Sequence, residues 1–241
     1  MNNQQILVKR AQLAEQAERY EDMFLFVKQL VQSDIRLNDE QYKLFANSAK
    51  HVVGARRSAW RVISSAEHKS QDEDEKSMIV EYREEIEKEL RQHCDEVLRL
   101  LENNLLKTEE GSGIETEVFC RKMQGDYYRY LVEVASGDEK SPVEQKANEA
   151  YAAATDAASV LSSTHPVKLG LAMNYSIFYY EILNEPKTAC QLAKNAFDAA
   201  LMELDNMDED AYEESTLIMQ LIRDNLTLWT ADSSAGDDEN G

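Results

Sequence analysis

Proline, glycine and cysteine are scarce in this chain, and their scarcity narrows the fold class. The 241 residues include only three prolines, eight glycines and three cysteines. Average usage is about 5% proline and about 7% glycine, so few positions can break a helix or carry a tight turn. Pro142, Pro166 and Pro186 each stand just inside an expected helix start, where proline is tolerated. The composition predicts an all-α protein.

Long apolar runs are also missing. We find no stretch of about 18 apolar residues that could span a membrane, and the first residues lack the charged-then-apolar pattern of a secretory signal. Cys94, Cys120 and Cys190 are odd in number and far apart, which indicates reduced cytoplasmic thiols without a disulfide framework. We therefore expect a cytoplasmic chain with no membrane partner.

The signals for nucleic-acid binding, metal binding and catalysis are weak. A net charge of −20 leaves few of the cations that binding to a nucleic-acid backbone requires. His93 and Cys94 are adjacent, but neighbours on a helix point about 100° apart, and no second such pair exists. The chain also lacks a plausible nucleophile–base pair and a glycine-rich phosphate loop. We expect no nucleic-acid partner, metal, cofactor or catalytic residue.

Acidic residues are absent from one window of this acidic chain. Asp and Glu number 46 overall, yet none falls within 41–66. The same window contains Lys43, Lys50, Arg56, Arg57 and Arg61. A cluster of cations in a window without acids favours a binding site for a small anion. The alternative is an ordinary solvated basic face.

The spacing of these cations favours the anion site. Lys50, Gly54, Arg57 and Arg61 follow i, i+4, i+7 and i+11, which places them within about 60° of one another on a helix. Glycine inside a helix costs about 1 kcal/mol relative to alanine, so Gly54 indicates a close approach by a ligand or another backbone. Arginine grips phosphate with two parallel hydrogen bonds and lysine adds a point charge.

Helical periodicity predicts nine helices. Their ranges are 3–17, 21–33, 39–66, 76–107, 114–136, 142–162, 167–183, 187–204 and 211–230. The short linkers favour antiparallel neighbours in a layered array with a concave side. We expect one domain over 1–231. Residues 232–241 are small and acidic without apolar anchors, which predicts a disordered tail.

Polar residues share helix faces with apolar ones in the second half of the chain. The first face holds Gly170, Met173, Asn174, Ile177 and Glu181, the second Leu217, Ile218, Leu221, Asn225 and Trp229, and the third Lys122, Asp126, Arg129 and Tyr130. An amide inside an apolar stripe must be hydrogen-bonded. Asn174 and Asn225 are therefore either satisfied core groups or two clamps on an extended peptide backbone.

Several long motifs resemble the 14-3-3 family of phosphoserine/phosphothreonine-binding adaptors. They read LAEQAERY (13–20), KHVVGARRSAWR (50–61), GDYYRY (125–130), NYSIFYYE (174–181) and STLIMQLIRDNLTLWT (215–230). They occur in the family's order, and the resemblance covers roughly residues 3–232. It implies nine antiparallel helices per subunit, an amphipathic groove in each subunit, and a cup-shaped dimer.

The resemblance also implies the site residues and the function. Phosphate binding is expected from Lys50, Arg57, Arg61, Arg129 and Tyr130; peptide-backbone binding from Asn174, Asn225 and Glu181; and the apolar groove wall from Met173, Leu217, Ile218, Leu221 and Trp229. The implied function is to clamp phosphorylated motifs of client proteins and so modulate their activity, localisation or assembly in signalling. We expect this in the cytoplasm, and in the nucleus together with clients.

Departures from the family pattern concern the dimer and the groove. The expected interface residues are Leu13, Ala17, Arg19, Ala59, Ile63, Tyr82 and Glu89. Ala59 replaces a serine whose phosphorylation splits family dimers, and Asp22 and Glu85 place like charges where the family often has an ion pair. We still expect a homodimer, with mixed dimers as a further possibility. Asn47 and Ala49 also stand where the family commonly has valine and tyrosine.

Two other classes of function remain open from the sequence. A generic helical-repeat scaffold could bind acidic unphosphorylated peptides with the same basic face. An enzyme could use the cationic pocket, although the chain offers none of the catalytic groupings noted above. Retained affinity for an unphosphorylated peptide would favour the scaffold.

Overall fold

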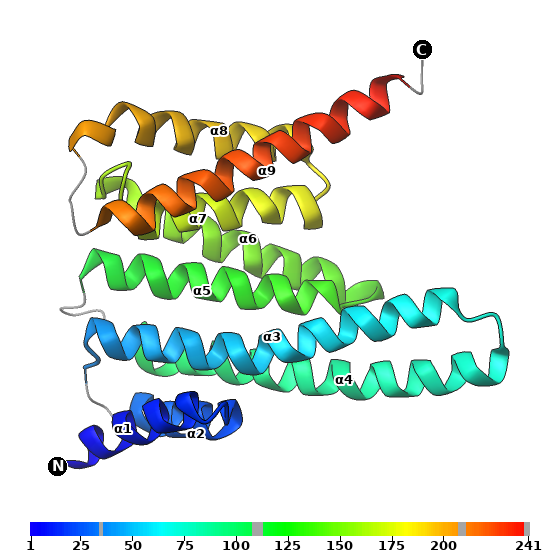
Figure 1. The fold of residues 1–241 in the computed structure, drawn as a ribbon, viewed down its shortest axis with the longest axis horizontal. Helices are drawn as coiled ribbons and strands as arrows, with labels where there is room; N and C mark the ends of the chain where they lie inside the picture. The colour runs from blue at the N-terminus through cyan, green and yellow to red at the C-terminus, as the bar shows by residue number, and fades with distance from the viewer. Residues whose placement is uncertain (34–35, 108–112, 207–210, 239–241) are drawn as a thin grey trace. The chain divides into compact units, whose positions relative to one another are not determined.

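The computed structural model describes residues 1–33, 36–107, 113–206 and 211–238, with side chains as far as 231 except at residue 206. Within these ranges the chain forms nine α-helices, joined by short 3₁₀ and π turns, and no strand (Figure 1). The all-α prediction is therefore confirmed. The chain divides into two compact units, Met1–Gly111 and Ser112–Gly241.

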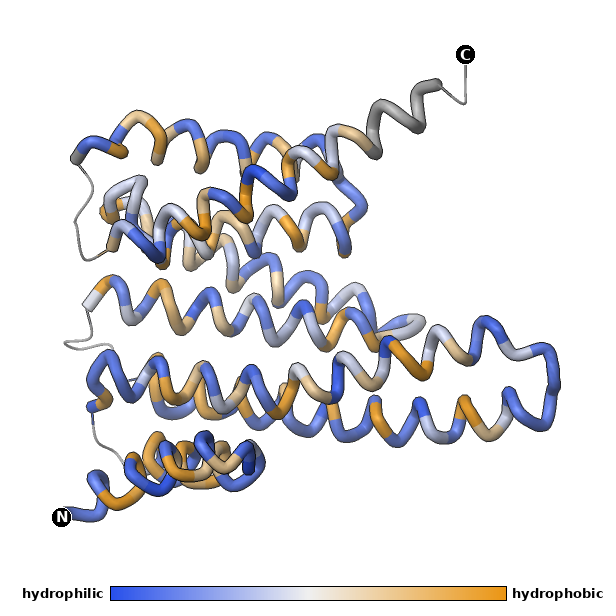
Figure 2. The backbone as a smooth tube through the Cα atoms, in the orientation of Figure 1, coloured by the Kyte–Doolittle hydropathy of each residue, from blue (hydrophilic) through white to orange (hydrophobic). Residues whose placement is uncertain are grey.

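The first unit contains four helices. They are α1 (Asn3–Gln16), α2 (Tyr20–Val31), α3 (Asp39–Lys69) and α4 (Glu73–Leu100), and a π turn at Leu101–Leu105 extends α4. The long helices α3 and α4 run side by side as a hairpin (Figure 1). The turn between them is hydrophilic (Figure 2), and the side chain of Asp72 caps the start of α4 by accepting from the Glu75 backbone N–H.

Local sequence signals fix the starts of two of these helices. Asn2 with Gln5, and Asn38 with Gln41, form reciprocal capping boxes at α1 and α3. Each box satisfies two backbone donors that a helix start leaves unpaired. The core of the unit consists of apolar side chains of α2, α3 and α4, among them Met23, Val27, Leu30, Phe45, Val52, Val53, Leu90 and Val97.

The second unit contains five helices. They are α5 (Ile114–Glu133), α6 (Lys140–Ala157), α7 (Pro166–Ile177), α8 (Pro186–Met202) and α9 (Tyr212–Asp238). A π turn at Phe178–Ile182 extends α7, and 3₁₀ turns lie at Gly137–Glu139, Ala158–Val160 and Leu204–Asn206. Pro166 and Pro186 open α7 and α8 as predicted.

Two hydrophobic clusters hold the second unit together. One joins α5, α6 and α7 around Tyr151 and Phe178, and the other joins α7, α8 and α9 around Ile222 and Trp229. Helix α5 approaches α6 closely at Gly125, where an added Cβ would lie 2.6 Å from the Tyr151 ring. Only glycine fits there without a shift, because the fully buried Tyr151 ring has no room to retreat.

The observed helix bounds differ from the predicted ones by a few residues at most ends. Pro142 is the third residue of α6, because a 3₁₀ turn leads directly into that helix. The largest difference is at α9, which ends at Asp238 instead of 230. Side chains beyond 231 lie outside the described residues, so the disordered acidic tail stays a prediction. The predicted gaps between helices at 34–38 and 108–113 also fall partly outside them, at 34–35 and 108–112.

Candidate functional site

Helix α3 presents the basic face that the sequence predicts. Lys50 and Arg61 are exposed and Arg57 is half-buried. No atom lies within 4 Å of the position that a Cβ on Gly54 would occupy. The glycine is therefore not needed for packing inside the protein, which agrees with its predicted role of leaving space for a ligand.

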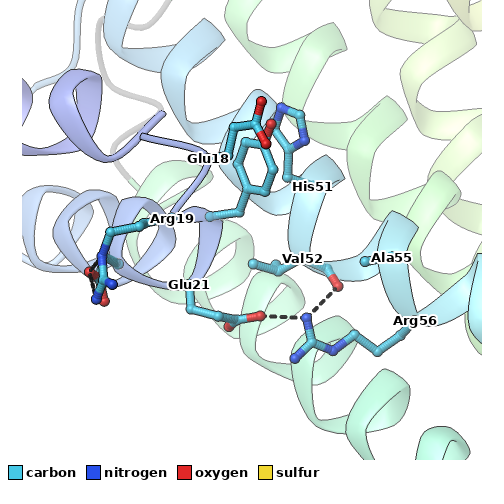
Figure 3. Close-up of a pocket in the computed structure, with 9 residues that line it drawn as sticks. Glu18, Arg19, Glu21, His51, Val52, Ala55 and Arg56 are labelled. Carbon is cyan, nitrogen blue, oxygen red and sulfur yellow. Dashed lines mark hydrogen bonds and ion pairs between the residues drawn. The ribbon is translucent and has the colours of Figure 1, made fainter. Parts of the chain in front are cut away.

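Arg56 stands in the same acid-free window but has a different role. Its guanidinium forms an ion pair with Glu89. It also forms an ion pair with Glu21 and donates to the Val52 carbonyl oxygen (Figure 3). Acids brought from α2 and α4 thus neutralise this arginine. The helical spacing already places Arg57, and not Arg56, on the face with Lys50 and Arg61.

A pocket of about 350 Å³ lies beside Arg56, between the start of α2 and the middle of α3 (Figure 3). Tyr20 and His51 stack in its wall with ring centroids 3.8 Å apart. Its remaining lining residues are Glu18, Arg19, Glu21, Asp22, Val52 and Ala55. Arg19 pairs with Asp22 at 2.5 Å, so the charges of this pocket largely compensate one another.

Helix α5 carries a buried charge network in the second unit. Lys122 Nζ lies 2.8 Å from Asp126 Oδ2, and the Tyr151 hydroxyl donates to Asp126 Oδ1 at 2.6 Å. Arg129 Nε donates to the same hydroxyl at 3.3 Å. The guanidinium carbon of Arg129 lies 4.8 Å from the centre of the Tyr130 ring. Arg129 is thus held by several groups, although only 7% of its side chain is exposed.

Asn174 on α7 joins this network. Its Nδ2 donates to Asp126 Oδ1 at 2.8 Å. The structure therefore brings together, within the second unit, one residue predicted to bind phosphate and one predicted to bind the peptide backbone. Glu181, the third predicted backbone ligand, is exposed on the π turn that follows α7.

The predicted wall residues differ in their exposure. Leu217 and Leu221 on α9 are 58% and 43% exposed, whereas Trp229 is only 4% exposed. Trp229 stacks on Tyr180 with ring centroids 4.7 Å apart, within the core shared by α7, α8 and α9. Met173, Ile218 and Asn225 are half-buried. The exposed leucines fit an apolar wall best, and Trp229 mainly supports the helix that carries them.

The predicted dimer residues lie on the first unit. Leu13 and Tyr82 are 51% and 53% exposed, Ala17 is exposed, and Ala59 and Ile63 are half-buried. Arg19 and Glu89 have partners within the chain, Asp22 and Arg56 respectively. Exposed apolar side chains are thus available, and the two charged residues are already compensated in the single chain.

Electrostatics fix the protonation states in the buried network. Burial would raise the pKa of Asp126, but the charges of Lys122 and Arg129 and the hydrogen bonds from Lys122 and Tyr151 lower it below its ordinary value. Burial would lower the pKa of Arg129, and the neighbouring Tyr151, Tyr130 and Asp126 raise it instead. Burial and the Asp126 charge raise the pKa of Tyr151. Asp126 is therefore ionised, Arg129 is protonated and Tyr151 is neutral at pH 7.

The contribution of Tyr151 could not be found from the sequence. Lys122, Asp126, Arg129 and Tyr130 share one helical arc, which the spacing indicates, but Tyr151 lies on α6 and its hydroxyl meets Asp126 only through tertiary packing. Its close contact with Gly125 was the available clue, because a glycine inside a helix signals close approach. Nothing in that clue identifies tyrosine as the neighbour.

Neither a metal-binding cluster nor a membrane-spanning helix occurs among the described residues. No group of three or more His, Cys, Asp or Glu side chains there could hold a metal ion. No helix among them is both long and apolar enough to cross a membrane.

Comparison with known proteins identifies the family. The model of the 14-3-3 protein family matches residues 10–230. The chain is 53% identical to 14-3-3-like protein 2 of Caenorhabditis elegans over 233 residues, covering 96% of this chain and 93% of that protein. It is 52% identical to 14-3-3 protein zeta of Bombyx mori over 235 residues, covering 97% and 94%. The chain belongs to the 14-3-3 family.

Membership establishes the broad function. The chain is a phosphopeptide-binding adaptor with a regulatory role and without enzymatic activity, and members of its family bind other proteins and form dimers. The generic scaffold for unphosphorylated peptides is not favoured.

Proposed function

We propose that this chain clamps phosphoserine or phosphothreonine segments of cytoplasmic client proteins with the residues that its motifs indicate. Lys50, Arg57, Arg61, Arg129 and Tyr130 bind the phosphate. The observation that carries the proposal is the face of α3, where two exposed cations flank Gly54, and a Cβ added to this glycine would meet no other group within 4 Å.

Charge explains the selectivity for phosphorylated segments. A phosphate adds about −1.5 to −2 charges and three acceptor oxygens, and each charge-assisted hydrogen bond contributes about 1.5–3 kcal/mol. Several cations and a phenol thus separate phosphorylated from unphosphorylated peptide by orders of magnitude in affinity. A carboxylate mimic carries less charge and fewer oxygens, so it binds poorly.

Asn174, Asn225 and Glu181 bind the backbone of the client peptide, and apolar residues of α7 and α9 contact its side chains. A side-chain amide offers both a donor and an acceptor to a main-chain amide. The exposure of Leu217 and Leu221 supports an apolar wall on α9. Asn47, exposed on α3, adds polarity near the basic face and alters client preference.

Two copies of the chain pair through the first unit, by the residues Leu13, Ala17, Arg19, Ala59, Ile63, Tyr82 and Glu89. Two sites in one dimer bind a doubly phosphorylated client bivalently, which raises affinity through effective concentration. Glu85 is exposed and lacks the positive charge common in the family, so the homodimer is weaker than family dimers that keep that ion pair. An exposed pair contributes under about 1 kcal/mol. Mixed dimers with related isoforms that carry the positive charge restore this ion pair.

The test is a fluorescence-polarisation titration with one peptide of the pattern Arg-Ser-x-Ser-x-Pro, phosphorylated or not at the second serine. We expect binding of the phosphorylated form only, and loss of that binding in Lys50→Glu. Lys69→Glu is the matched control, because Lys69 is an exposed lysine on the same helix, about 100° away from Lys50. Equal binding of both peptide forms, or equal effects of the two substitutions, would refute the proposal.

A further inference from the structure

Asp126 is the shared acceptor of the second unit. Its carboxylate accepts from Lys122 on its own helix, from Tyr151 on α6 and from Asn174 on α7, at 2.8, 2.6 and 2.8 Å respectively. Arg129 Nη2 lies 3.8 Å from Asp126 Oδ1. Only 8% of the Asp126 side chain is exposed, so the carboxylate itself is poorly placed to meet a ligand.

We propose that Asp126 is a positioning residue that couples Asn174, which binds the peptide backbone, to Arg129, which binds the phosphate. Its carboxylate orients the Asn174 amide directly and the Arg129 guanidinium through Tyr151. The orientations of both ligand-binding groups therefore depend on the same residue. This inference rests on the proposed function, because it assumes that Arg129 binds phosphate and Asn174 binds the peptide backbone.

The hydrogen bond to Asp126 determines which way the Asn174 amide faces. A side-chain amide has two N–H donors and one carbonyl acceptor, and rotation by about 180° exchanges them. One donor of Asn174 is used by Asp126, which leaves the second donor and the oxygen for a ligand in a fixed arrangement. Without the carboxylate, both orientations become available and binding must select one of them.

The orientation of Arg129 depends on the same carboxylate through Tyr151. The Tyr151 hydroxyl donates its single hydrogen to Asp126 at 2.6 Å, so its oxygen lone pair faces Arg129 Nε at 3.3 Å. Glu133 Oε1 lies 3.7 Å from Arg129 Nη1. The guanidinium is therefore held by Tyr151 and Glu133 before any ligand arrives, which lowers the entropy lost on binding.

A simple countercharge role makes the opposite prediction. If Asp126 only neutralised Lys122 and Arg129, removing its charge would raise the local positive potential and tighten the binding of a phosphate. Loss of positioning instead weakens binding, and weakens it less once Asn174 is already absent. The sign of the change and its dependence on Asn174 therefore separate the two roles.

The experiment compares Asp126→Asn, Asn174→Ala and the double variant in titrations with the phosphorylated and unphosphorylated peptides. We expect Asp126→Asn to weaken phosphopeptide binding about tenfold or more, and the double variant to be at least about threefold tighter than the product of the single effects predicts. Asp198→Asn removes the same charge from an exposed position on α8 (49% exposed side chain), and we expect it to change affinity less than about twofold.

Two further measurements guard against a folding defect. Tyr151→Phe keeps the buried ring and removes only the hydroxyl, and it should weaken phosphopeptide binding severalfold. In the free protein, NMR should show a shift of the Asn174 side-chain amide signals in Asp126→Asn and little shift in Asp198→Asn. Unchanged or tighter binding in Asp126→Asn, additive effects with Asn174→Ala, or an unmoved amide signal would each overturn the inference. If the wild type itself ignores phosphorylation, the proposed function fails first.

Discussion

The two units hold their charged side chains in different ways. In the first unit, Lys50 and Arg61 are exposed, and the two acids that pair with Arg56 are each 56% exposed. In the second unit, the side chains of Asp126 and Arg129 are 8% and 7% exposed, with Tyr151 fully buried beside them. The first arrangement depends on water and salt, whereas the second depends on packing.

This difference concerns the freedom that each unit leaves to its charged side chains. An exposed side chain keeps more of its rotamer freedom than a buried one. Buried groups anchored by several helices lose that freedom on folding. We infer that the exposed charges of the first unit are the more adaptable and that the buried charges of the second unit are the more rigid.

The largest expected effect on stability comes from replacing one glycine in each unit by alanine. Gly125→Ala places a Cβ 2.6 Å from the Tyr151 ring, and we expect it to lower the free energy of unfolding by about 1–3 kcal/mol. Gly54→Ala meets no atom within 4 Å, and better helix propensity should stabilise the protein by up to about 1 kcal/mol. Chemical denaturation measures both changes.

Equal or reversed effects of the two glycine substitutions would show that the close contact between α5 and α6 relaxes easily. In that case the second unit would be less tightly packed than its buried network requires. The inferred division between an adaptable and a rigid unit would then lose its main structural basis.

The next effect tests the buried hydroxyl against an exposed one. Tyr151→Phe leaves Asp126 and Arg129 each without one hydrogen-bond partner, and we expect a loss of about 1–2 kcal/mol in the free energy of unfolding. Tyr82→Phe removes a hydroxyl from a side chain in the first unit that is 53% exposed, and should change stability by less than about 0.5 kcal/mol. Thermal unfolding of both variants at pH 7 distinguishes the two cases.

The difference between exposed and buried charges also explains which features could be predicted from the sequence. The α3 basic face follows from helical spacing and the absence of acids, because an exposed face needs no other helix to define it. The helices themselves follow from periodicity and proline placement. The bonds that Asp126 makes to Tyr151 and Asn174 could not be predicted, because they depend on how α5, α6 and α7 pack.

The pH dependence of stability should also separate the units. Charges and hydrogen bonds around Asp126 lower its pKa. Its contribution to the free energy of unfolding is therefore complete above about pH 4 and is lost as the pH falls further. Burial and the nearby Arg56 charge lower the pKa of His93, so the folded state favours the neutral ring. The contribution of His93 to the free energy of unfolding therefore begins to fall already below about pH 6.5. NMR titration of His93 and of the Asp126 carboxyl carbon checks both. A midpoint above the ordinary value for either group would contradict the assignment.

The smallest expected effect concerns the ion pairs of Arg56. Its side chain is 23% exposed and its two acidic partners are 56% exposed, so water and salt screen most of the attraction. We expect Arg56→Gln to lower the free energy of unfolding by less than about 1 kcal/mol, and by less again in high salt. Lys194→Gln, which removes a more exposed pair with Asp198 on α8, should have no measurable effect. A loss comparable to that of Tyr151→Phe would mean that the ion pairs of Arg56 are structural, and the contrast between the two units would weaken.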